Sequence, residues 1–109
     1  MKTMHQTLAH GRWRELSLCE QMGNIGSEVS RMLLWRDKGR SSFEHAQDRA
    51  FELFELTLED PRWRGRLREI ARAREVFADA ILGGTEYQSS LEDLERYFFH
   101  FAYCARQHI

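Results

Sequence analysis

Arginine and histidine are the first residues that could do chemistry in this chain of 109 amino acids. Arg40 and His45 stand with four residues between them, and Arg96 and His100 with three. A histidine held beside its substrate can act as a general base. A lone histidine without an orienting carboxylate, such as His100, is more often a packed or surface residue. We therefore predict no catalytic residue.

A second set of polar side chains lies in the segment 23–31, GNIGSEVSR. At helical spacing, Asn24, Glu28 and Arg31 fall on one face, where they could form a polar pocket with a group from another helix. We add Arg74 to this candidate pocket because it falls on an apolar stripe, and a buried arginine needs a carboxylate partner. Glu28 is the candidate partner.

The same segment also has a purely structural interpretation, which we favour. Each glycine inside a helix costs roughly 1 kcal/mol relative to alanine, so a compensating contact is expected. The small side chains would form a thin strip against which a bulky aromatic residue of another helix can lie. The residues of this strip are Gly23, Gly26, Ser27 and Ser30.

Arginines are concentrated between positions 62 and 74, where they could follow a phosphate backbone while Trp63 stacks on a base. The candidate nucleic-acid-binding residues are Arg62, Arg64, Arg66, Arg68 and Arg72. The preceding segment, 44–60, is rich in acidic residues. Neighbouring helices of opposite charge would pair along their shared edge, so we favour internal pairing and keep nucleic-acid binding as the alternative.

The run YFFHFAY, residues 97–103, is aromatic on nearly every side of a helix. Four helices cannot enclose all of these rings, so some of them are expected to face a partner chain. The candidate interface residues are Tyr97, Phe99 and Tyr103. This pattern predicts a homodimer, with a different protein partner as a further option.

Two resemblances add to this interpretation. The segment Arg40, Ser41, Ser42, Phe43, Glu44, His45 resembles the arginine, four to six residues, histidine pattern of the HEPN ribonuclease-like helical bundles, as do the size and the helix count. Here the pattern spans a loop and a helix start, whereas in that family it lies in the body of a late helix. The NIGSEV segment is similar to one in small bacterial helical proteins, and it implies no particular activity.

Helix boundaries can be read from capping residues. A serine followed three residues later by a glutamate is a capping box, and an Asp-Pro pair is a good helix start. The four expected helices begin at Ser17 with Glu20, at Ser41 with Glu44, at Asp60 with Pro61, and at Ser89 with Glu92; they end at Gly39, at Asp60 with Pro61, at Gly83 with Gly84, and near Gln107.

Apolar residues recur in these segments at helical spacing, and the connections between the segments are short. Matched helices with short loops pack as antiparallel neighbours. The sequence predicts an all-α fold, a four-helix antiparallel up-down-up-down bundle forming a single domain over residues 1–109. Residues 1–15 are a candidate tail, from which Trp13 could pack back onto the bundle.

Composition limits the remaining possibilities. A formal net charge of −1 offers no global attraction to nucleic acid or to anionic lipid. Cys19 and Cys104 match no zinc pattern and are predicted to be reduced thiols, with Cα atoms within about 12 Å of each other in this topology. We expect no metal, no cofactor, no membrane span and no signal peptide, and by default a cytoplasmic location.

The leading hypothesis from the sequence is a non-enzymatic helical interaction module that forms a homodimer. A nucleic-acid-binding module is the first alternative. An HEPN-like ribonuclease or a toxin-antitoxin component is the second.

Overall fold

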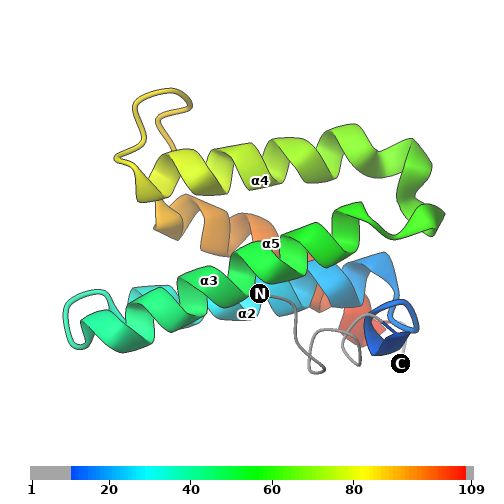
Figure 1. The fold of residues 1–109 in the computed structure, drawn as a ribbon, viewed down its shortest axis with the longest axis horizontal. Helices are drawn as coiled ribbons and strands as arrows, with labels where there is room; N and C mark the ends of the chain where they lie inside the picture. The colour runs from blue at the N-terminus through cyan, green and yellow to red at the C-terminus, as the bar shows by residue number, and fades with distance from the viewer. Residues whose placement is uncertain (1–10, 108–109) are drawn as a thin grey trace.

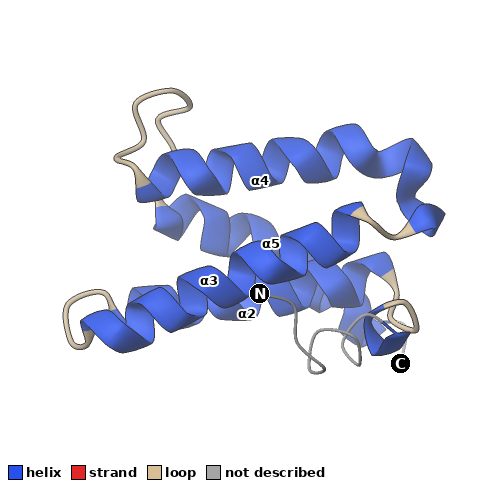
Figure 2. Cartoon of the chain, viewed as in Figure 1, coloured by secondary structure: helices blue, strands red, loops and turns tan. Residues whose placement is uncertain are grey.

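The structure is a computed structural model that describes residues 11–107 (Figure 1). Its elements in chain order are α2 (Leu18–Trp35), α3 (Arg40–Leu58), the 3-10 helix η1 (Pro61–Arg66), α4 (Leu67–Ile81) and α5 (Leu91–Gln107). Figure 2 shows helices joined by loops, with no strand between residues 11 and 107. The prediction of an all-helical fold is confirmed.

Helix α2 begins at the predicted capping box. The Ser17 hydroxyl accepts a hydrogen bond from the Glu20 amide at 3.1 Å, and the Glu20 carboxylate accepts one from the Ser17 amide at 2.8 Å. The predicted end at Gly39 is wrong, because α2 ends at Trp35 and Gly39 is the N-cap of α3.

Helix α3 begins at Arg40, so the predicted capping box of Ser41 and Glu44 does not form. Once Arg40 is helical, Ser41 lies inside the first turn and cannot act as the N-cap. The Glu44 carboxylate instead accepts from Nε of Arg40 at 3.0 Å.

The predicted third helix is divided in two. Asp60 caps its start and Pro61 follows, as expected, but the first turns form η1. Trp63 leaves the helical region of backbone space (φ −102°, ψ 23°), and the α-helix begins only at Leu67. Gly83 and Gly84 follow the end of α4 with positive φ values, which confirms the predicted glycine termination.

Helix α5 has its capping box one residue later than predicted. The Ser90 hydroxyl accepts from the Asp93 amide at 3.1 Å, and the Asp93 carboxylate accepts from the Ser90 amide at 3.1 Å. The prediction of Ser89 with Glu92 is therefore wrong in register, whereas the predicted end at Gln107 is confirmed.

Helix α2 packs against both α3 and α5, and α4 reaches α3, α5 and η1. Trp13 packs onto this core with 7% of its surface exposed, as predicted, while residues 1–10 of the candidate tail lie outside the described residues. The largest fully buried apolar side chains are Phe54, Phe77, Phe98, Met22, Ile25, Met32, Leu56 and Ile70.

The two cysteines join the ends of α2 and α5. Cys19 and Cys104 form a disulfide with a Cα–Cα distance of 5.9 Å, which confirms the predicted proximity and contradicts the prediction of reduced thiols. Cys19 lies in the first turn of α2 and Cys104 in the last turn of α5. Because these turns pack side by side, the cysteines come within bonding distance, a relation that their spacing in the sequence does not indicate.

Candidate interaction surface

Helices α2 and α5 approach each other closely through the glycines of α2. A Cβ atom added to Gly26 would lie 2.5 Å from Cβ of Phe98, and one added to Gly23 would lie 3.2 Å from Cα of Ala102. The predicted thin strip that receives an aromatic side chain is therefore confirmed. Phe98 is 1% exposed. Its insertion at Gly26 fixes which side of α5 faces the core.

The neighbour of Phe98 consequently points away from the core. Phe99 is 58% exposed, and Tyr103, one helical turn further along α5, is 53% exposed. Tyr97 is placed differently from these two predicted interface residues. Its ring is half-buried and packs edge-on against Phe98 and Phe101, with centroid distances of 5.1 and 5.4 Å.

A shallow hollow of about 280 Å³ lies next to Phe99, between α2 and α5. Gly23 and Ala102 contribute to its lining, together with the short side chains of Ser27 and Ser30. The hollow exists because these positions carry little or no side chain. The outer face of α2 and α5, defined by Phe99, Tyr103 and this hollow, thus combines a projecting ring with a depression.

Charged side chains surround this outer face. The guanidinium of Arg106 lies 6.0 Å from the centroid of the Phe99 ring. The Ser30 hydroxyl donates to Glu95 at 2.7 Å, and Arg96 pairs with Asp93. The surroundings of Phe99 therefore carry both signs of charge.

The predicted polar pocket forms only in part. Glu28 pairs with Arg31 at 2.6 Å, and both line a hollow with His45 of α3. Asn24 does not line this hollow, and its amide donates to the Glu20 carbonyl at 2.8 Å. Arg74 lies on α4, which packs against α3, so its guanidinium pairs with Glu55 at 2.7 Å. The prediction that Glu28 is the partner of Arg74 is wrong.

Arg74 is also less buried than its place on the stripe suggests, with 37% of its side chain exposed. Its Nε lies close to Glu55 without the alignment of a hydrogen bond, and its guanidinium lies 5.1 Å from the centroid of the Phe51 ring. Arg74 therefore packs across α3 as a long amphipathic side chain.

Three of the six arginines of the basic segment, residues 62–74, pair locally. Arg62 bonds Asp60 at 2.7 Å, Arg66 bonds Glu69 at 2.7 Å, and Arg72 lies 4.0 Å from Glu75. The expected ion pairs between the acidic helix and the basic helix are thus mostly replaced by pairs between residues close in sequence. The pair of Arg74 with Glu55 joins α4 to α3.

Arg64 and Arg68 are exposed and make no ion pair with any residue in the range 11–107. The ring of Trp63 is not free to stack on a base. Its Nε1 donates to Gln21 at 2.8 Å, and the Arg62 guanidinium covers its face at 4.4 Å.

The residues of the HEPN-like pattern lie on different surfaces. Arg40 pairs with Glu44 at the start of α3, and His45 lines a shallow hollow between α2 and α3. His100 is exposed on α5. Within the described part of the chain, no hydrogen bond or ion pair joins His45 to His100.

A buried polar network near the start of α2 was not predicted from the sequence. The Gln21 side chain is fully buried and donates to the Trp13 carbonyl at 2.7 Å and to Asp60 at 3.0 Å. The Trp13 indole N–H donates to Thr57 at 3.0 Å. Each of these polar groups has a partner inside the chain, so the network holds the N-terminal segment against η1.

Asp60 is the charged member of this network and is 2% exposed. Hydrogen bonds from Arg62, and then from Gln21, lower its pKa to about 2 despite its burial. Asp60 was predicted as a helix cap, but the sequence pattern did not show its second contact, with Gln21. A glutamine within an otherwise apolar stretch of α2 was the available indication.

Among residues 11–107, no three His, Cys, Asp or Glu side chains are grouped so that they could hold a metal ion. In the same range, no helix is long and apolar enough to span a membrane. Comparison of the chain with protein-family models, with curated proteins and with solved structures finds no match.

Proposed function

We propose that this chain is a helical interaction module that forms a homodimer through the outer face of α2 and α5. One observation carries the proposal: the exposed ring of Phe99 lies on the same face as the hollow lined by Gly23 and Ala102. In a two-fold dimer each subunit uses the same patch, so a projection and a depression on one face can fill each other reciprocally.

The energetics favour such burial. Removing a phenylalanine side chain from water is worth roughly 1.5–3 kcal/mol, and a two-fold dimer buries two copies of Phe99. Tyr103, one turn away on α5, adds a ring with a polar end, a type of residue that is common at interfaces. The mixed charges around Phe99 allow two copies to meet without net repulsion.

The antiparallel up-down-up-down connectivity of the four long helices is part of the same proposal. The contacts of Gly26 with Phe98 and of Gly23 with Ala102 run in opposite chain directions, which supports antiparallel packing of α2 and α5. The disulfide also bears on the compartment. Disulfides persist mainly in oxidising compartments, so the pair Cys19 and Cys104 favours such a location over the cytoplasm.

Sedimentation velocity of the wild-type chain and of Phe99→Glu tests the dimer. We expect the wild type to be dimeric at micromolar concentration and Phe99→Glu to be monomeric, because the charge would have to enter an apolar contact. Leu82→Glu is the matched control, since Leu82 is 82% exposed and follows α4. A monomeric wild type, or a Phe99→Glu variant as dimeric as the control, would contradict the proposal.

The HEPN-like alternative has a separate test. Metal-independent cleavage of RNA that is lost in His45→Ala or His100→Ala would replace the proposed module with a ribonuclease.

A further inference from the structure

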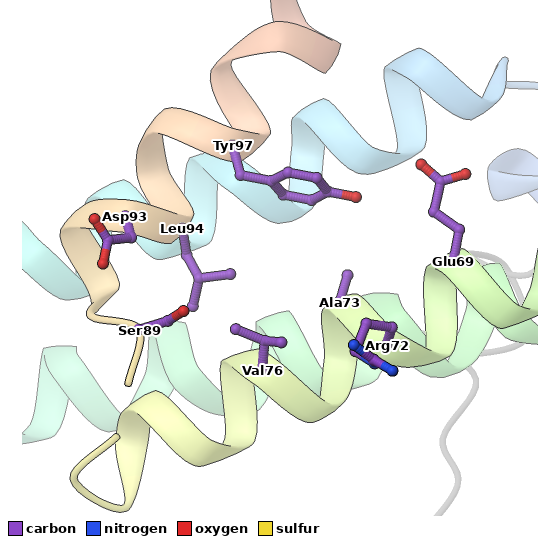
Figure 3. Close-up of a pocket in the computed structure, with 8 residues that line it drawn as sticks. All are labelled: Glu69, Arg72, Ala73, Val76, Ser89, Asp93, Leu94 and Tyr97. Atoms are coloured by element: carbon purple, nitrogen blue, oxygen red, sulfur yellow. The ribbon is translucent and has the colours of Figure 1, made fainter. Parts of the chain in front are cut away.

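A groove of about 340 Å³ lies between α4 and α5 (Figure 3). Tyr97 lines this groove, whereas Phe99 lines the hollow between α2 and α5. The walls of the groove include Ala73 and Val76 from α4 and Leu94 from α5, and the ring of Tyr97 extends from α5 across it. Ala73 contributes only a methyl group, so its side chain leaves space between α4 and α5 at this position. The volume lies within the range of small-molecule sites.

Two acidic groups at the groove are already neutralised by arginines of the chain. Glu69 accepts two hydrogen bonds from Arg66, at 2.7 and 2.9 Å. Asp93 accepts from the Ser90 amide at 3.1 Å and pairs with Arg96. Neither carboxylate is therefore available as the main counter-charge for a cationic ligand.

Arg72 is the most loosely paired of the charged side chains that line the groove. Its closest carboxylate, that of Glu75, is 4.0 Å away, and its guanidinium rests 5.4 Å from the centroid of the Tyr87 ring. Burial, and then the nearby charge of Glu69, raise the pKa of Tyr97, so its side chain stays uncharged at the groove.

We propose that this groove binds a small amphipathic carboxylate. The apolar chain would lie on Ala73, Val76 and Leu94 beside the Tyr97 ring, and the carboxylate would pair with Arg72. At roughly 30 Å³ for each water-sized group, the groove holds about eleven non-hydrogen atoms. This size matches a medium-chain fatty carboxylate such as octanoate.

The proposal is tested by NMR titration of the whole chain with octanoate. We expect saturable shifts of the Tyr97 ring and Val76 methyl signals, a measurement that needs no variant. Octylammonium has the same chain and the opposite charge, and acetate has the same charge and no chain. We expect each of these two probes to bind at least fivefold more weakly than octanoate.

Arg72→Gln should weaken octanoate binding at least fivefold. Arg68→Gln is the matched control because Arg68 is an exposed arginine one turn earlier on α4 and does not line the groove. Three results would each overturn the proposal. Octylammonium could bind as tightly as octanoate, Arg72→Gln and Arg68→Gln could bind octanoate with equal affinity, or the signals of Tyr97 and Val76 could show no saturable shift. Phe99→Glu should keep octanoate binding, so failure of the dimer and failure of this site are distinguishable.

Discussion

Removing the disulfide between Cys19 and Cys104 should strongly destabilise the fold. The bond closes a loop with a sequence separation of 85 residues. In the chain-entropy relation, a loop of this length removes about 15 cal/mol/K from the unfolded ensemble, which corresponds to about 4.6 kcal/mol at 25 °C. The free energy of unfolding of a native protein is only about 5–15 kcal/mol. The reduced chain is therefore expected to be only marginally stable.

Urea unfolding followed by tryptophan fluorescence measures this effect, because Trp13 is buried near the start of α2. The oxidised chain should unfold at a clearly higher urea concentration than the chain with reductant. The Cys19→Ala/Cys104→Ala double variant is the control, since reductant should leave its midpoint unchanged. A midpoint that reductant does not move would refute the reasoning. Two free thiols in the denatured, non-reduced chain would also refute it, and they would support the predicted cytoplasmic location.

Gly26→Ala should lower the free energy of unfolding by about 1–3 kcal/mol, because the added Cβ meets Phe98 at 2.5 Å; a urea midpoint at or above that of the wild type would show that α5 can shift freely. The Asp60 carboxyl has a folded pKa of about 2 against an ordinary value of 3.8, so it stabilises the fold above about pH 4, and about 2 kcal/mol of this is lost as the pH falls towards 2. Thermal melts from pH 5 to 2 should show this loss, and a curve equally steep in Asp60→Asn would contradict the assignment. For the basic segment we expect no saturable binding of single-stranded RNA by fluorescence anisotropy at about 0.15 M salt. Binding that weakens with salt and in Arg64→Ala/Arg68→Ala would instead support the nucleic-acid alternative.

Capping residues predicted two of the four helix starts correctly. Asp60 caps η1 and is fixed by Gln21, and Ser17 caps α2 next to the disulfide at Cys19. Ser41, by contrast, has the same local pattern, but Gly39 takes the N-cap in the short turn after α2. Local pattern alone cannot choose between caps a few residues apart, because each provides a similar free energy.

Side-chain partners were harder to predict than helix faces. The strip at Gly26 followed from the cost of glycine in a helix, which is a local property. The partner of Arg74 depends on which helix lies beside α4, and that is a property of the whole fold. The sequence indicated a carboxylate partner for Arg74, and the structure provides Glu55 from α3 in place of Glu28 from α2.

The consecutive aromatic residues of α5 explain why one helix carries three different surfaces. Successive helical residues point about 100° apart, so Tyr97, Phe98 and Phe99 cannot all enter the same core. The insertion of Phe98 at Gly26 fixes the rotation of the helix. That rotation turns Tyr97 into the groove beside α4 and Phe99 out to solvent. The close approach at Gly26 therefore accounts for the exposure of Phe99, which we propose as the dimer contact, and for the position of Tyr97 at the groove.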